Sequence, residues 1–433
     1  MRSFHRILAG CIVSISVFSL WISPPVRNHI HVQPGYFMQV GQVDDWGIHC
    51  PEWIRQSLSL QIEGEAQSVF GNDIQGAVAI DEENPLRMQA VHAGQSRVSL
   101  MLWETIPLKV MEVESVEPRH LVPGGHSIGV MLQSNGVMVV GFAPITDSHG
   151  EKSCPAGEQG LKIGDRVMKA NGQAVHNEEE LLAILDKSQG KAVQFEIERE
   201  KERLMIAVQP VYCPESGRFR IGLYVRDQAV GIGTLSFWDP KSHAYAALGH
   251  VILDADTHQA IEVGNGHIVS APVSFVSPGR PGVPGEKTGS FSDAGSIDGN
   301  ILKNCLFGIY GVTKHELDNE LSGGTVEAGS GRQVHLGKAE IFTVVKDERI
   351  ERFEVEIARI YPSRTNGKNM LLKITDERLL RLTGGIIQGM SGSPILQDGK
   401  LIGAVTHVLL NDPTRGYGVF IDQILENMPV LDE

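Results

Sequence analysis

Residues 389–394, GMSGSP, contain the side chain with the clearest chemical potential in this sequence. Glycines before and after Ser391 let the backbone turn sharply and leave N–H groups free to face a developing oxyanion. The pattern predicts an acyl-transfer nucleophile at Ser391, with the N–H groups of Gly389 and Ser391 forming its oxyanion hole. The alternative is a plain surface turn, because Gly, Ser and Pro dominate turns generally.

His250 is the candidate base for this nucleophile. It lies in the apolar run ALGHVI (residues 247–252), where the preceding glycine permits close packing against a second barrel. A lone histidine at a strand end is often purely structural. A histidine about 140 residues before the serine, in a β-rich segment, nevertheless matches the order found in chymotrypsin-like enzymes and favours His250 as the group that takes the serine proton.

Two aspartates compete for the third position, the carboxylate that holds the imidazole in its proton-accepting tautomer. Asp298 lies between His250 and Ser391 at roughly chymotrypsin-like spacing, whereas Asp376 ends an apolar strand shortly before the nucleophile. Spacing alone favours Asp298. Either residue could equally be a turn aspartate, and the glycine after Asp298 strengthens that alternative.

The sequence predicts no metal and no cofactor. One cluster could hold zinc or calcium by residue type, but its spacing fits no named metal motif: His250, Asp254, Asp256 and His258. Residues 279–288 (GRPGVPGEKT) superficially resemble a phosphate loop, yet Glu286 puts a negative charge where phosphate would lie. None of the five cysteines falls in a Cys-x-x-Cys pair, which excludes a zinc ribbon.

Length and charge restrict the possible classes of protein. A chain of 433 residues exceeds what one core usually organises, so two or three domains are expected. The formal net charge of -14, with no local cluster of Lys and Arg, provides no basic face for phosphate backbones. Nucleic acid is therefore not expected as a partner.

The N-terminus carries an export signal. Residues 7–22 form an almost uninterrupted apolar run preceded by Arg2, His5 and Arg6. The run is short for the ~20 residues of a membrane span, so a cleaved signal peptide and an uncleaved anchor over residues 1–27 both remain open. The absence of a small-x-small cleavage site favours the anchor, and the positive flank places the remainder outside the cytoplasm.

The patterns in the rest of the chain predict mostly β structure. Residues 33–117 contain short alternating runs such as SLSLQIE (57–63), which predict a small all-β N-terminal domain. Residues 217–433 alternate short β-like runs with Gly/Pro turns and show little helical periodicity. This pattern fits a closed all-β architecture such as paired barrels, the double β-barrel of a chymotrypsin-like serine protease domain.

Residues 118–211 resemble a PDZ domain. The run GGHSIGV (124–130) stands where that family keeps its carboxylate-binding loop, and GLKIGDRV with NGQAV (160–175) matches its strand-turn-strand centre. Asn177 can cap the helix that follows, with Glu180 completing a capping box. The resemblance implies a peptide partner held by β-augmentation, with Ile128, Gly129 and Val130 binding its terminal carboxylate.

Together, the export segment, the PDZ domain, ALGH (247–250) and TGGIIQGMSGSP (383–394) resemble the stage IV sporulation protein B peptidase family of spore-forming bacteria. In that family the corresponding histidine and serine are base and nucleophile, which map onto His250 and Ser391. The family aspartate lies shortly before the serine, so the resemblance supports Asp376 over Asp298.

The same resemblance implies a membrane-tethered serine endopeptidase that lies between the mother-cell and forespore membranes. It would cleave itself and the extracytoplasmic part of a membrane-bound regulator of an intramembrane protease, and so trigger activation of a late sporulation sigma factor. The alternative is a non-catalytic PDZ scaffold whose protease-like domain only binds partners.

Met390 departs from the general chymotrypsin pattern. In that pattern an aspartate before the serine pairs with a newly freed N-terminus to complete the active site, and methionine cannot make this ion pair. Any switch in this protein must therefore act by another route, for which the PDZ domain is the candidate.

Overall fold

The computed structural model describes residues 35–45, 55–63, 76–291 and 295–429. The chain divides into two compact units, residues 1–119 and residues 120–433. The predicted export segment, residues 1–27, lies outside the described residues. Among the helices in the described ranges, none is long and apolar enough to cross a membrane.

The described strands of the first unit form two small sheets. One sheet has the order β1-β7-β6-β3, with β1 parallel to β7, and the other has the order β2-β5-β4. Side chains that alternate toward the interior, such as Met88 and Ala90, build its apolar core. The strands are β1 (Gly35–Gln39), β2 (Val43–Asp45), β3 (Leu58–Glu63), β4 (Val78–Ile80), β5 (Arg87–Ala90), β6 (Gly94–Leu102) and β7 (Ile106–Val116).

The second unit begins with a β-barrel whose core includes Ile128, Leu235, Tyr245 and Ile309. Its strands come from both sides of the PDZ segment in the sequence. They are β8 (His120–Pro123), β9 (Ser127–Phe142), β18 (Leu223–Trp238), β19 (Ala244–Ala247), β20 (Val263–Ser270), β23 (Asp298–Asn300), β24 (Lys303–Cys305), β25 (Gly308–Val312) and β26 (Val326–Glu327). A separate hairpin consists of β21 (Val273–Ser277) and β22 (Glu286–Gly289).

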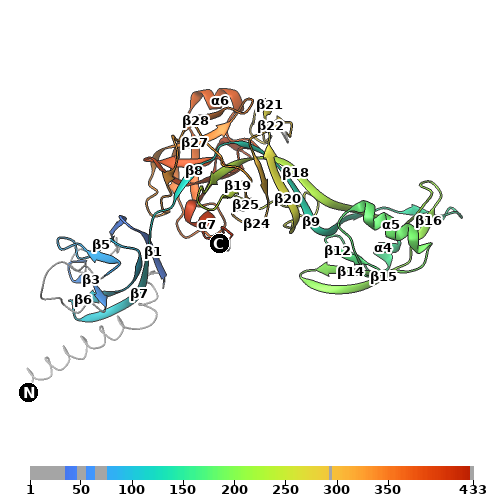
Figure 1. The fold of residues 1–433 in the computed structure, drawn as a ribbon, viewed down its shortest axis with the longest axis horizontal. Coiled ribbons are helices and arrows are strands. Elements are labelled where there is room, and N and C mark those ends of the chain that lie inside the picture. Colours follow the sequence, from blue (N-terminus) through green and yellow to red (C-terminus); the bar gives the residue numbers. More distant parts are fainter. Residues whose placement is uncertain (1–34, 46–54, 64–75, 292–294, 430–433) are drawn as a thin grey trace, which may run out of the picture. The chain divides into compact units, whose positions relative to one another are not determined.

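Two 16-residue strands, β9 and β18, run antiparallel to each other from this barrel into the PDZ domain (Figure 1). The pairing extends from Thr234 opposite Ser127 in the barrel to Leu223 opposite Phe142 in the PDZ domain, with two register shifts. The PDZ domain is therefore inserted into the first barrel through a continuous two-stranded ribbon.

The PDZ domain packs one helix against a sheet. Asn177 caps helix α5, accepting a hydrogen bond from the Glu180 N–H at 2.8 Å, and Leu181, Ile184 and Leu185 face the core. Its elements, besides the ends of β9 and β18, are β10 (Ile145–Thr146), β11 (Lys152–Ser153), α4 (Pro155–Glu158), β12 (Arg166–Ala170), β13 (Gln173–Ala174), α5 (Glu178–Ser188), β14 (Val193–Arg199), β15 (Glu202–Val208), β16 (Val211–Cys213) and β17 (Arg218–Arg220).

A second barrel closes in the order β27-β28-β29-β32-β31-β30. Its elements are β27 (Gly337–Val344), β28 (Ile350–Ile360), β29 (Met370–Ile374), α6 (Glu377–Thr383), β30 (Pro394–Gln397), β31 (Lys400–Leu409), β32 (Asp412–Phe420) and α7 (Ile421–Leu425). The fold is thus the mostly β, double-barrel architecture with a PDZ domain that the sequence predicts.

The predicted boundary between PDZ and peptidase differs from the structure. Residues 120–134 were expected in the PDZ domain, but β8 and the first half of β9 pair with β18, β20 and β26 of the first barrel. A strand shared by two domains has one continuous hydrophobic pattern, so the sequence shows no break where one domain gives way to the other.

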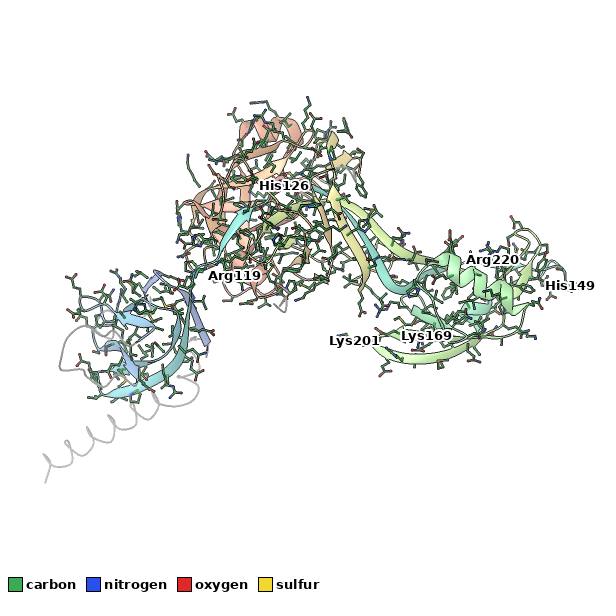
Figure 2. All side chains as sticks on the ribbon, in the orientation of Figure 1. Arg119, His126, His149, Lys169, Lys201 and Arg220 are labelled. Carbon is green, nitrogen blue, oxygen red and sulfur yellow. The ribbon has the colours of Figure 1, made fainter. Side chains whose placement is uncertain are left out.

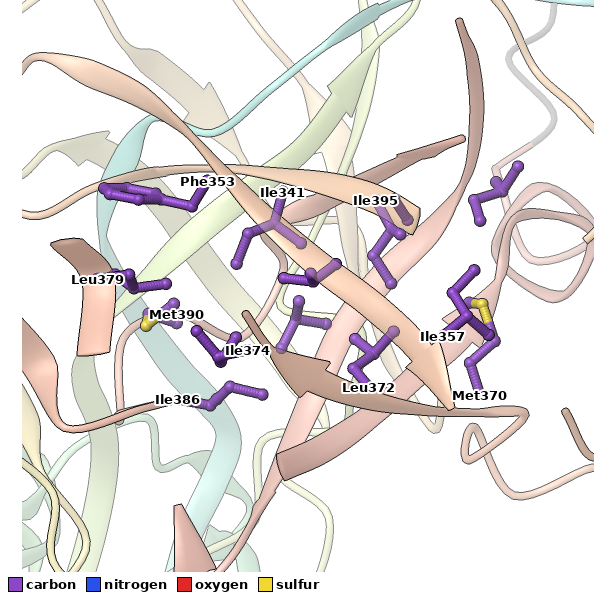
Figure 3. Packing of buried hydrophobic residues seen from close by; sticks show 14 of the residues in the cluster. Ile341, Phe353, Ile357, Met370, Leu372, Ile374, Leu379, Ile386, Met390 and Ile395 are labelled. Carbon is purple, nitrogen blue, oxygen red and sulfur yellow. The ribbon is translucent and has the colours of Figure 1, made fainter. Parts of the chain in front are cut away.

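Met390, the residue before the predicted nucleophile, is part of the second barrel's core. Its side chain is fully buried among residues that include Ile374, Leu379 and Ile386 (Figure 3). The turn is therefore held to the second barrel by apolar packing.

We expect Met390→Ala to destabilise the protein by about 2–5 kcal/mol, because truncating a buried side chain leaves a cavity. Met390→Leu conserves volume and should cost less than about 1.5 kcal/mol. Urea unfolding monitored by tryptophan fluorescence measures both. Equal stability of the Ala variant and the natural protein would contradict this anchoring role.

Candidate active site

The turn that carries Ser391 lies between α6 and β30 and contacts both barrels. Gly392 N–H donates to Val405 O of β31 at 2.8 Å, which ties the turn to the second barrel. On the other side, Thr234 of β18 donates its N–H to Ser391 O at 2.9 Å and its hydroxyl to Gly389 O at 2.7 Å. Strand β18 thus binds the carbonyl groups of the two residues that flank Met390.

The close approach of this turn to β18 requires glycine at position 392. Gly392 has φ +95°, and a Cβ there would overlap Thr234 O and lie 2.5 Å from Leu248 N. Both the backbone conformation and the contact exclude a side chain. The glycine after Ser391 therefore serves the junction between the barrels as well as the turn.

His250 follows β19 and is held in one tautomer by its own chain. Its Nδ1 lies 2.9 Å from Val251 O, a carbonyl that can only accept, so Nδ1 carries the proton and Nε2 is left as the basic nitrogen. Burial lowers the pKa of His250 below its ordinary value of 6.5. The imidazole is consequently neutral at pH 7, as a general base must be.

Asn304 of β24 fixes the segment behind this histidine. Its side-chain amide accepts from Ile252 N–H at 2.9 Å and donates to Ile252 O at 2.9 Å and Ile261 O at 2.8 Å. Sequence reasoning did not identify Asn304, since an isolated asparagine in a β-rich segment has no distinguishing pattern.

His250 and Ser391 contact adjacent residues of β31. The Ser391 hydroxyl donates to Thr406 O at 2.7 Å, and the rings of His250 and His407 lie 5.2 Å apart. Burial, followed by the charges of His250 and Lys368, lowers the pKa of His407 to about 4, so this second ring is also neutral at pH 7.

No hydrogen bond joins Ser391 to His250 within the described ranges. The Ser391 hydroxyl must leave Thr406 O before His250 can take its proton. Such bonds are often long or misaligned in a free enzyme and tighten when substrate binds.

The proposed oxyanion donors are available. Among the described residues, neither Gly389 N–H nor Ser391 N–H donates to a protein acceptor, whereas the intervening Met390 N–H is used by Ile387 O at 3.1 Å. Two free N–H groups that flank a bonded one are the pattern needed to receive a negatively charged oxygen.

Asp376 is not hydrogen-bonded to His250 in the described part of the chain. It is the N-cap of α6, accepting from Leu379 N–H at 3.0 Å and from Glu354 N–H at 3.4 Å. Gly367, which precedes β29, lies beside the residue before His250, since a Cβ on Gly367 would be 3.9 Å from Gly249 O. Strand β29 then spans about 13 Å from Met370 to Ile374, and Asp376 lies beyond that far end.

Asp298, the competing aspartate, is also placed elsewhere. It forms an ion pair with Lys314 at 2.6 Å and lies on β23. Neither aspartate is bonded to His250 in the described part of the chain, and the Val251 carbonyl occupies the position on Nδ1 that a carboxylate would take.

The three residues predicted to bind a peptide carboxylate lie inside the first barrel. Ile128, Gly129 and Val130 belong to β9 and are paired on both edges, with β18 and with β20. Ile128 and Val130 are buried in the barrel core. Their backbone therefore has no free edge for a peptide, and the segment is no carboxylate-binding loop here.

A second apolar-Gly-apolar run, residues 221–223, lies at the start of β18 within the PDZ domain. Gly222 has φ +78°, and β18 from Leu223 to Arg226 pairs on one side only, with β9, beside α5. Figure 2 shows the difference in place: Arg220 lies in the PDZ domain and His126 among the peptidase barrels. The apolar-Gly-apolar pattern at residues 221–223 is visible in the sequence. Residues 128–130 carry the same pattern, so the sequence alone does not distinguish the two.

The cluster once considered for a metal is occupied by other interactions. Asp254 and Asp256 both pair with Arg226, at 3.4 and 2.6 Å. Across the described residues, no group of three or more His, Cys, Asp or Glu side chains is arranged to hold a metal ion.

The lowered pKa of His250 predicts where activity is lost on acidification. Because the neutral imidazole is the base, kcat/KM falls as pH drops through this pKa, and the midpoint should lie below pH 6.5. A pH profile with a peptide substrate, compared with His407→Gln, measures it. A midpoint above 6.5, or one that moves upon the His407 change, would contradict this assignment.

Asp376 offers a direct test of its role. Asn caps helices about as well as Asp, so Asp376→Asn should keep both stability and turnover, while Asp376→Ala should lose about 1 kcal/mol of stability. A triad aspartate would instead lose about 10⁴-fold in kcat upon the change to Asn. Steady-state kinetics with thermal unfolding distinguishes the two.

A sequence comparison finds a known protein that is similar to part of this chain. A protein of Clostridium perfringens (strain 13 / Type A), named as a zinc metalloprotease, is 31% identical over 86 residues, which cover 20% of this chain and 25% of that protein. The chain therefore spans a quarter of the length of that relative.

Solved structures show further similarity. The PDZ domain of the SdrC-like protein from Listeria monocytogenes is 18% identical in sequence, with a TM-score of 0.17. The match covers 21% of this chain and 87% of that chain. The inactive form of the Rv3671c protease from M. tuberculosis H37Rv is 9% identical in sequence, with a TM-score of 0.27. The match covers 45% of this chain and 81% of that chain.

Family descriptions cover most of the second unit. Residues 128–209 match the PDZ domain, and residues 217–425, which contain His250 and Ser391, match the SpoIVB peptidase S55 family. The turn at Ser391, the neutral histidine and the double barrel are the features expected of a serine peptidase, and over residues 217–425 the chain is a serine peptidase similar to the SpoIVB peptidase S55 family.

Proposed function

We propose that this serine peptidase uses Ser391 as nucleophile and His250 as base, in an endopeptidase reaction. The observation that supports this most strongly is that the N–H groups of Gly389 and Ser391, in the turn that carries the serine, have no acceptor among the described residues. A turn with only a structural role would satisfy these donors internally.

The proposed reaction proceeds by acyl transfer. Nε2 of His250 takes the hydroxyl proton as Ser391 Oγ attacks the peptide carbonyl, and the N–H groups of Gly389 and Ser391 stabilise the tetrahedral oxyanion, each by about 3 kcal/mol. The imidazolium then gives its proton to the leaving amine. Water repeats the sequence on the acyl-enzyme and restores Ser391.

The Val251 carbonyl takes the orienting part of the triad carboxylate in this scheme. It fixes the Nδ1–H tautomer of His250 at 2.9 Å without adding a negative charge. A neutral acceptor stabilises an imidazolium less than a carboxylate would, so the geometry corresponds to a Ser391–His250 dyad.

We further infer that the PDZ domain binds a peptide terminus at the open edge of β18. The free strand edge beside α5, preceded by the run at residues 221–223, has the arrangement that β-augmentation requires. The partner would thus be a peptide or protein with an accessible C-terminal carboxylate.

The biological assignment follows the family resemblance. We propose that the chain is exported, tethered by residues 1–27, and cleaves itself and the extracytoplasmic part of a membrane-bound regulator of an intramembrane protease, leading to activation of a late sporulation sigma factor. Support comes from the S55 match and from the apolar run with its positive flank.

Fluorophosphonate labelling tests the catalytic assignment. The protein should be labelled at Ser391, lose labelling in Ser391→Ala, and keep it in Ser393→Ala, a matched control because Ser393 is buried two residues away and its hydroxyl has no described partner. Absence of label in the natural protein, with a PDZ ligand present, would favour the alternative of a non-catalytic scaffold.

A further inference from the structure

The oxyanion hole depends on the orientation of one peptide bond, the one between Gln388 and Gly389. In a trans peptide the C=O and the N–H point in opposite directions. For Gly389 N–H to face a reacting carbonyl, Gln388 O must therefore point away from the hole and be held there. Rotation of this single peptide would replace a donor with an acceptor and abolish the hole.

Strand β22 holds this carbonyl. Lys287 N–H donates to Gln388 O at 3.0 Å, and Gln388 N–H donates to Gly285 O at 2.8 Å, so residues 285–287 and Gln388 form a short parallel bridge. The bond from Lys287 to Gln388 O directs Gly389 N–H away from β22. That N–H is one of the two left without a protein acceptor in the described part of the chain.

The side chain of Lys287 reinforces the same peptide. Gly389 has φ +92°, and a Cβ at this position would lie 3.1 Å from both Cβ and Cδ of Lys287, so the lysine stem lies directly against the open face of the glycine. Beyond the stem, Lys287 Nζ donates to Thr343 Oγ1 of β27 at 2.8 Å. The lysine thereby spans β22, the nucleophile turn and the second barrel.

Burying a lysine in this position is unfavourable for the free energy of folding. The side chain is only 5% exposed, and burial lowers its pKa to about 7. Thr343, fully buried, is the one described acceptor for Nζ, and no carboxylate pairs with it in the described ranges. An apolar residue would fold here at lower cost, which indicates that the lysine serves the turn rather than the core.

We propose that Lys287 is a positioning residue of the oxyanion hole, which locks the Gln388–Gly389 peptide with its N–H toward the substrate carbonyl. The backbone bond sets the orientation, the stem blocks the reverse rotation, and Nζ anchors the stem to Thr343. This proposal rests on the proposed function, in which Gly389 N–H stabilises the oxyanion.

The test compares Lys287→Ala, which removes the stem and the anchor, with Lys287→Met, which keeps a stem and removes only the anchor. Lys314→Met is the control, because Lys314 is exposed and pairs with Asp298, and neither residue has a described contact with the turn. Measurements on the full-length chain are kcat and KM with a peptide substrate, and the affinity of a peptide boronic acid, which mimics the tetrahedral intermediate. Active-site titration corrects for any unfolded fraction.

We expect Lys287→Ala to lower kcat about 100-fold, the effect of losing one oxyanion donor, with KM within about threefold of the natural protein. Boronate affinity should fall with kcat, Lys287→Met should recover at least about tenfold of the loss, and Lys314→Met should match the natural protein. A correctly folded Lys287→Ala with unchanged kcat and boronate affinity would overturn the proposal. Failure of the natural protein to react at Ser391 would instead overturn the proposed function.

Discussion

The contact between Thr234 and the nucleophile turn is the interaction on which the arrangement of the site depends. One residue of β18 bonds the carbonyls on both sides of Met390, through its N–H and its hydroxyl. Because the turn is also bonded to β31, this contact joins the two barrels at the turn that carries Ser391. The absence of a side chain at Gly392 is what allows the backbones to come this close.

Backbone groups and apolar packing organise the site where charged pairs would be expected. Val251 O orients His250, Lys287 N–H orients the oxyanion peptide, and Met390 anchors the turn in the second barrel's core. Neutral hydrogen bonds and buried methylenes are little affected by salt, unlike exposed ion pairs. Enzymes completed by a new N-terminus need a carboxylate next to the nucleophile. The geometry of this turn does not, because neutral contacts hold it.

A single strand serves both functional regions of the second unit. Strand β18 starts with an open edge beside α5 in the PDZ domain and ends in the first barrel, where Thr234 holds the turn at Ser391. Its partner β9 follows it along most of this length. The insertion of the PDZ domain through a paired ribbon explains why residues 127–134 pair with strands of the first barrel although residues 128–209 match the PDZ domain in sequence.

Local chemistry determined much of this protein from sequence alone: the β-rich double-barrel class, the helix capped by Asn177, and the choice of Ser391 and His250 as candidates, since each follows from spacing or from neighbours within a few residues. The contacts of Asp376, the place of residues 128–130, and the contacts of Asn304, Thr234 and Lys287 were decided only by the tertiary structure. Thr234 and Gly389 are far apart in sequence, and only closure of two barrels brings them together. The apolar-Gly-apolar pattern occurs at 128–130 and again at 221–223, and only strand pairing distinguishes a buried central strand from an open edge.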